Sequence, residues 1–119
     1  MTQNQNLKPF DLEDRTLNFA KRVRNYVKKL PRTISNLEYG RQLIRSSGSQ
    51  AANYIEANES LSRKDFFLRV KICRKETKES RLWLTLSEPN SEDTREQNEL
   101  IQEATELMKI FGSIVEKGK

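Results

Sequence analysis

Residues 99–115 read ELIQEATELMKIFGSIV, and this stretch decides the fold class. Its apolar residues recur every three or four positions, which is the spacing that places side chains on one face of an α-helix. They are Leu100, Ile101, Ala104, Leu107, Met108, Phe111, Ile114 and Val115. The positions between them are mostly polar or charged. We therefore expect an amphipathic helix over about residues 93–117, buried on one side against other helices.

Three further segments show the same helical period, at about residues 12–30, 36–58 and 63–86. The predicted buried positions are Leu12, Phe19, Ala20, Val23, Val27 and Leu30 in the first; Leu37, Ile44, Ala51 and Ile55, flanked by Leu43 and Tyr54, in the second; and Phe66, Val70, Cys73, Thr77, Ser80 and Leu84, with Leu68, Ile72, Leu82 and Leu86 beside them, in the third. Cys73 lies on an apolar seam and is predicted to be a small core residue. Trp83 is off the seam, where we expect it to anchor a boundary or an interface.

Residues with helix-capping chemistry mark where these segments begin. Asp11 is the predicted N-cap of the first helix, and Ser62 with Asp65 has capping-box spacing before the third. Ser35 with Glu38 has the same spacing and is the predicted start of the second helix.

Short connections at about residues 31–35, 59–62 and 87–92 join the four segments. Short links favour antiparallel packing of helices that follow each other in the chain. We therefore predict an all-α fold, an antiparallel up-down-up-down four-helix bundle. Residues 11–117 would form this single domain, and residues 1–10 would be a flexible N-terminal tail.

Composition excludes several classes of function. The 119 residues contain no histidine and one cysteine, which removes His-based acid–base catalysis, His-containing metal motifs and any intrachain disulfide. There is no glycine-rich phosphate loop and no apolar run of about 18 residues. We expect a non-enzymatic cytoplasmic protein with no cofactor, no metal and no membrane span.

Positive charge is concentrated in two of the predicted helices, and the net charge is +5. The third helix places Lys64, Lys71, Arg74, Lys75 and Lys78 in one sector, flanked by Arg81, and the first places Lys21, Arg24 and Lys28 on one stripe. Such stripes can neutralise phosphates in RNA or DNA. The alternative is a solvated face, paired in part with Glu76, Glu79 or the acidic fourth helix.

Polar residues recur along one face of the second helix: Arg45, Ser49, Asn53 and Glu56. Buried at a helix boundary, they would need hydrogen-bonded partners. We predict a structural network that fixes bundle register or a subunit contact, with Lys78 or Arg81 as candidate partners. Ligand binding is the alternative. The small residues around Gly48 predict a close approach of a neighbouring helix.

A family resemblance rests on the run RQLIRSSGSQAANYIEANESLSRKDFFLRVKICRKETKESRLWL, residues 41–84, and on FDLEDRTLNFAKRV (10–23) and ELIQEATELMKIFGSIV (99–115). The chain resembles the four-helix bundle proteins encoded by intervening sequences in bacterial 23S rRNA genes. Accessory proteins of diversity-generating retroelements (Avd-like) look similar. This resemblance implies a ring-shaped homopentamer, and it places recurring scaffold or interface residues at Arg45, Ser49, Asn53, Glu56, Glu79, Ser80 and Arg81.

The accessory-type relatives are basic and bind nucleic acid and a reverse transcriptase, so the resemblance implies RNA or DNA, the chain itself and a reverse transcriptase as partners. The expected function is a basic homo-oligomeric adaptor that binds the nucleic-acid backbone. A protein-interaction scaffold without direct nucleic-acid binding is the alternative.

Overall fold

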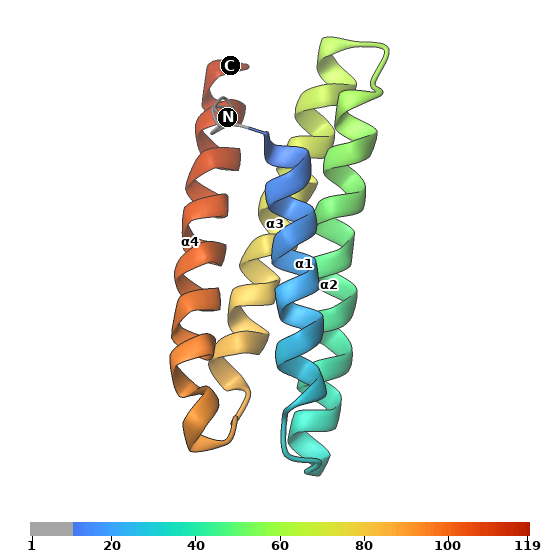
Figure 1. Cartoon of the computed structure of the whole chain (residues 1–119). Coiled ribbons are helices and arrows are strands. Elements are labelled where there is room, and N and C mark those ends of the chain that lie inside the picture. Colours follow the sequence, from blue (N-terminus) through green and yellow to red (C-terminus); the bar gives the residue numbers. More distant parts are fainter. Residues whose placement is uncertain (1–10) are drawn as a thin grey trace, which may run out of the picture.

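The computed structural model describes residues 11–119 and contains four long α-helices (Figure 1). They are α1 (Leu12–Lys28), α2 (Ile34–Asn58), α3 (Arg63–Leu86) and α4 (Thr94–Lys117), with a short 3-10 turn, η1 (Ser91–Asp93), before α4. The described residues contain no strand, so the all-α, four-helix prediction is confirmed. None of these helices is long and apolar enough to cross a membrane. The tail predicted for residues 1–10 lies outside the described part of the chain.

Capping side chains fix the starts of three helices. The Asp11 carboxylate accepts the Asp14 N–H, and the Ser62 hydroxyl accepts the Asp65 N–H, as their sequence positions predict. The prediction for α2 was wrong, because the residue that caps it is Thr33. Its backbone is extended and its hydroxyl accepts the Asn36 N–H at 3.1 Å, so the helix begins two residues before the predicted start at 36.

The helices are arranged so that each packs against its two neighbours. In Figure 1 the chain runs down α1, up α2, down α3 and up α4. Extensive contacts join α2 to α3, α3 to α4 and α1 to α2, whereas α1 touches α4 more sparsely. Within residues 11–119, α1 and α3 share few or no close contacts and therefore lie at diagonal corners.

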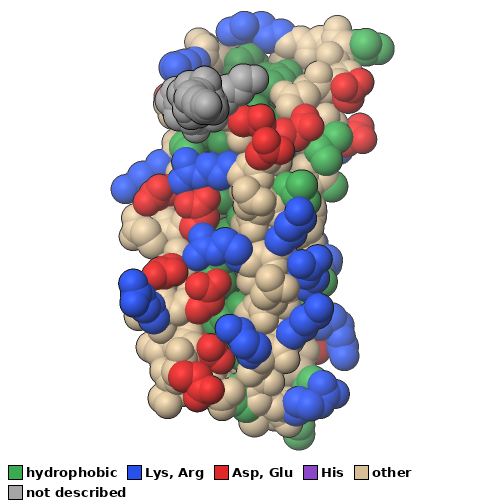
Figure 2. All heavy atoms as spheres, in the orientation of Figure 1, with side chains coloured by type: hydrophobic (Ala, Val, Ile, Leu, Met, Phe, Trp, Pro, Cys, Tyr) green, Lys and Arg blue, Asp and Glu red, His purple; other side chains and the backbone are tan. Residues whose placement is uncertain are grey.

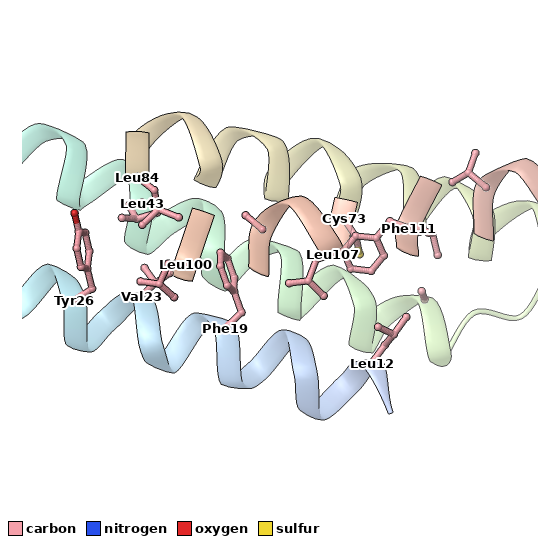
Figure 3. Close-up of a cluster of buried hydrophobic side chains, with 14 of the residues drawn as sticks. Leu12, Phe19, Val23, Tyr26, Leu43, Cys73, Leu84, Leu100, Leu107 and Phe111 are labelled. Atoms are coloured by element: carbon pink, nitrogen blue, oxygen red, sulfur yellow. The ribbon is translucent and has the colours of Figure 1, made fainter. Parts of the chain in front are cut away.

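All four helices contribute to one apolar core (Figure 3). The core includes Leu12, Phe19, Val23 and Tyr26 from α1, Leu43 from α2, Val70, Cys73 and Leu84 from α3, and Leu100, Leu107 and Phe111 from α4. Each fully buried aliphatic or aromatic side chain stabilises the fold by about 1.5–3 kcal/mol relative to exposure. The apolar seams predicted for α1, α3 and α4 are thus the ones that the fold buries.

The buried face of α2 agrees with the prediction only in part. Ala51 and Leu43 are buried as predicted, but Leu37, Ile44 and Ile55 are 45%, 44% and 48% exposed. The helix instead buries small and polar residues, which are Asn36, Gly40, Ser46, Ser47, Gln50 and Ala57.

Close packing against α1 explains this orientation of α2. A Cβ atom at Gly40 would lie only 3.0 Å from Val27 Cγ1, so glycine permits the approach of the two helices. The buried Gln50 amide donates to the Thr16 carbonyl at 2.8 Å, which provides a partner for a polar group inside the bundle. The face of α2 with small and polar side chains packs against α1 because the space beside Val27 is narrow. The larger aliphatic side chains of α2 remain at the surface.

Candidate nucleic-acid interface

The outward face of α3 carries a stripe of cations, which we call the α3 stripe. It consists of Lys64, Lys71, Arg74, Lys75 and Lys78, all of them exposed. None of the five forms an ion pair with a carboxylate in residues 11–119. Lys64, Lys71 and Lys78 recur every seventh residue, so their Cα atoms are about 10.5 Å apart along the helix axis. The stripe therefore presents positive charge along most of the helix.

Three features modify this stripe. Arg81 does not belong to it, because its side chain is half-buried and donates to the Thr105 hydroxyl of α4 at 3.3 Å. Lys75 lies near enough to Glu79 to help lower the pKa of that carboxyl. Exposed leucines also lie on α3: Leu68 is 55% and Leu82 is 50% exposed. The outward face of α3 is therefore both basic and partly apolar.

The predicted cations of α1 form a separate surface. Lys21, Arg24 and Lys28 are exposed, and none is ion-paired with a described carboxylate. In Figure 2, side chains of Lys and Arg gather along the α1–α2 side of the visible face. Because α1 and α3 lie at diagonal corners, the two predicted stripes face different directions and do not form one continuous patch.

The acidic fourth helix pairs with other cations, along what we call the α1–α4 seam. Arg15 binds Glu103 at 2.7 Å and Glu106 at 2.8 Å, and Arg22 lies 3.6 Å from Glu99. The hydrogen bond and charge of Glu103 are the main reasons why the pKa of Arg15 is raised. Red and blue side chains alternate along this side of the molecule in Figure 2. The glutamates of α4 therefore neutralise cations, but Arg15 and Arg22 are not among the cations that the sequence predicted to bind nucleic acid.

Arg45 of α2 is the centre of a polar cluster between α2 and α3. Its guanidinium donates to Glu79 and, at 3.2 Å, to Glu76, whose side chain is buried. Glu79 also accepts the Trp83 indole N–H at 3.1 Å. This bond, followed by the contact with Arg45, lowers the pKa of the Glu79 carboxyl. Trp83 in turn stacks on Tyr39, with ring centroids 5.9 Å apart.

The other predicted network residues are divided among smaller contacts. Ser80 shares a 2.7 Å hydrogen bond with Ser46. Asn53 donates to the Ser49 carbonyl and hydroxyl and accepts from Arg69 at 2.9 Å.

Some residues of the predicted network do not join it. Glu56 is exposed, and its side chain has no hydrogen bond or ion pair among the described residues. Neither Lys78 nor Arg81 contacts Arg45. A Cβ atom at Gly48 would meet nothing within 4 Å, so the predicted close approach there is wrong.

Sequence reasoning missed several partners in these clusters. Glu76, Trp83, Ser46 and Arg69 all contact predicted residues, yet the prediction left them out of the network. The three-residue spacing of Glu76 and Glu79 was the available signal, because it places two carboxylates where one arginine can reach both.

Cys73 is fully buried, as predicted for a core residue, and its thiol donates to the Gln50 carbonyl at 3.4 Å. Burial raises the pKa of this thiol to about 12, so it stays protonated and unreactive at neutral pH. The described residues contain no group of three or more Cys, Asp or Glu side chains placed to hold a metal ion.

Comparison with known proteins places the chain among related sequences. The family model described as 23S rRNA-intervening sequence protein matches residues 9–113. A crystal structure from Bacteroides thetaiotaomicron, described as a protein of unknown function from the S23 ribosomal protein family, is 34% identical. The match covers 87% of this chain and 97% of that one, with a TM-score of 0.76. Comparison with curated proteins gives no match.

Proposed function

The chain belongs to the 23S rRNA-intervening sequence protein family, and from this premise we propose that it is a non-enzymatic, cytoplasmic adaptor that binds the phosphate backbone of RNA or DNA. The observation that carries the proposal is the α3 stripe, five exposed cations that form no ion pair with a described carboxylate. Lysine and arginine on one helix face attract phosphates and release their counterions. The surface binds by charge and shape rather than by base sequence.

The α3 stripe is the principal contact in this proposal. It spans about 21 Å from Lys64 to Lys78 at 1.5 Å per residue, long enough to meet several phosphates. One aromatic side chain, Phe67, lies beside Lys64 and Lys71, but it is half-buried and the Arg63 guanidinium lies over its ring, 4.9 Å from the centroid. The three α1 cations face another direction and form a second, weaker contact at most.

The proposed assembly is a ring-shaped homopentamer of antiparallel bundles. A ring repeats the α3 stripe once per copy, which turns weak single contacts into strong binding by avidity. Arg45 and its partners Glu76 and Glu79 hold α2 against α3, and so keep the stripe-bearing helix in register. Sedimentation velocity of the purified chain tests the stoichiometry, and a concentration-independent monomer contradicts the ring.

Binding is tested by fluorescence anisotropy with an RNA duplex and a structured RNA at about 50 mM salt, where phosphate contacts are strong. The triple variant Lys71→Ala, Arg74→Ala, Lys78→Ala removes three cations from each copy. The slope of log affinity against log salt is negative, and we expect its magnitude to decrease by about three for each engaged copy. The matched control Lys21→Ala, Arg24→Ala, Lys28→Ala should change it much less. Absence of wild-type binding to either RNA at this salt overturns the proposal.

A protein-interaction scaffold without direct nucleic-acid contact is the second candidate function. The observation in its favour is that Leu68 and Leu82, both about half exposed, lie on α3 beside the lysines. Exposed leucines suit a protein partner better than a phosphate backbone. A reverse transcriptase is the partner class suggested by the resemblance to retroelement accessory proteins. Partner binding that survives nuclease treatment, but is lost on reversal of Lys71, Arg74 and Lys78, favours the scaffold.

A further inference from the structure

The exposed aliphatic face of α2 is a feature that the proposed function leaves unexplained. The buried side of this helix is small and polar, while Leu37 and Ile44 remain 45% and 44% exposed. Large aliphatic side chains that recur along one exposed helix face are typical of a surface that meets another protein.

These side chains line a groove between α1 and α2. The groove has a volume of about 390 Å³, and its floor includes Val27, Leu37 and Ile44. Gly40 also lines the groove, at the point where α1 and α2 approach each other closely. The volume falls within the range of about 300–1,000 Å³ that concave binding sites span. The groove is thus large enough to receive aliphatic side chains from a partner.

The rim of the groove is positively charged. Lys28, Arg32 and Arg41 line it, and no Asp or Glu does. Among the described residues, Lys28 and Arg32 form no ion pair, and Arg41 contacts only Glu38, at 3.5 Å. Figure 2 shows blue side chains along this side of the molecule. An apolar floor with a basic rim is complementary to an apolar segment with acidic flanks.

We propose that the α1–α2 groove binds an acidic amphipathic helix of a partner protein. Aliphatic residues of that helix, at i, i+3 or i+4 and i+7, would occupy the floor. Its aspartates or glutamates would meet the rim cations Lys28, Arg32 and Arg41. This inference goes beyond the proposed nucleic-acid adaptor, because it assigns a second, protein-binding surface away from the α3 stripe.

Other occupants fit the groove less well. Nucleic acid would find no aromatic side chain on the floor for base stacking. A second copy of the chain could offer its exposed leucines, Leu61 in the α2–α3 connection or Leu68 and Leu82 on α3. Lysines of α3 accompany these leucines, and the rim cations would repel them. A separate acidic segment avoids this repulsion.

The probe is a fluorescein-labelled synthetic helix with leucines on one face and glutamates elsewhere. A second peptide has lysine in place of every glutamate. In anisotropy titrations against the full chain, we expect the glutamate peptide to bind at least about tenfold more tightly than the lysine peptide. Equal binding of the two peptides, or binding of neither, overturns the proposal.

Variants locate the binding site. Ile44→Asp should weaken binding of the glutamate peptide at least about tenfold, because it places a carboxylate on the apolar floor. Leu17→Asp is the matched control, since Leu17 is 46% exposed on α1 and does not line the groove. It should leave peptide binding unchanged. Circular dichroism of both variants confirms that the helices persist, since both sites are on the surface.

Three readouts separate this proposal from the proposed function and from self-assembly. Ile44→Asp should retain RNA binding, and the triple alanine variant of the α3 stripe should retain peptide binding. Loss of RNA binding in Ile44→Asp would assign the groove to nucleic acid and overturn the protein-partner proposal. A change in the sedimentation coefficient of Ile44→Asp without peptide would assign the groove to contacts between copies, with the same consequence. If the wild type does not bind RNA, the nucleic-acid adaptor proposal is overturned, but the peptide measurements still test the groove.

Discussion

The α1–α4 seam and the α3 stripe contain the same types of cation in opposite surroundings. On the seam, Arg15 is 29% exposed and is held by two glutamates of α4. On the stripe, Lys71 and Lys78 are exposed and have no ion-paired partner among the described residues. A count of lysines and arginines treats these surfaces alike, but only the second leaves its charge available to an external anion.

The difference arises from which neighbour each helix face meets. The α4 glutamates at 96, 99, 103 and 106 recur every three or four residues and so line the side of α4 that meets α1. On the outward face of α3, Arg74 lies near Gly112 of α4, but no described carboxylate lies within ion-pair distance of the stripe. Whether the cations of a helix face are neutralised thus depends on the helix face that lies opposite. This can be tested by changing the residues of one face at a time.

Removal of the central seam acid should have the largest effect. Glu103→Ala eliminates two hydrogen bonds from Arg15, of 2.7 and 2.9 Å, and charge-assisted bonds of this kind contribute about 2 kcal/mol in partly buried settings. We expect a corresponding fall in the free energy of unfolding, measured by urea denaturation at 222 nm. Glu116→Ala is the control, since its pair with Lys119 is exposed on both sides and should contribute less than about 0.5 kcal/mol. Equal stability of the two variants contradicts the distinction between seam and surface.

Placing acids on the α3 stripe should make it resemble the seam. Leu68→Glu with Leu82→Glu puts carboxylates four residues after Lys64 and Lys78, close enough to pair with them. We expect RNA affinity to fall about tenfold, or about 1.4 kcal/mol. The control is Leu68→Gln with Leu82→Gln, which changes the same positions without adding charge. Similar affinities for the two double variants would show that the stripe does not bind RNA through its charge.

Acid titration of the seam should have the smallest effect. Hydrogen bonds from Gln102 and Arg15 lower the pKa of Glu106 below its ordinary value of 4.5. A lowered folded-state pKa stabilises the fold above the unfolded-state pKa, and this contribution disappears as pH falls through the folded-state value. The unfolding free energy should therefore decline below about pH 4.5. Glu106→Gln and Arg15→Gln should each make that decline shallower, and a decline identical to wild type in both variants contradicts the assignment.

Sequence periodicity predicted three of the four helices in detail. In α1 and α4 the large apolar residues recur at the helical period, so only one face of each helix can be buried. In α3 the predicted seam is buried although it includes the small residues Cys73, Thr77 and Ser80. The N-caps Asp11 and Ser62 are local features, because each side chain bonds the backbone three residues ahead. Local chemistry of this kind is visible in a sequence without knowledge of neighbouring helices.

The orientation of α2 could not be obtained in this way. Its pattern offers two faces, an aliphatic one with Leu37 and Ile44 and a small, polar one with Gly40 and Gln50. Periodicity favours the aliphatic face, but the space beside Val27 of α1 admits only the small one. The same limit applies to the predicted polar network, where Arg45 reaches Glu76 and Glu79 rather than Lys78 or Arg81.

By itself, the sequence determined that this protein is a set of four amphipathic helices, that its positive charge is concentrated on α1 and α3, and that it lacks histidine chemistry. Only the tertiary structure decided which cations are neutralised and which are exposed, and that α2 leaves an aliphatic groove at the surface. The reason is physical. Helix formation and capping depend on residues within one turn, whereas ion pairing and burial depend on side chains brought together from distant parts of the chain.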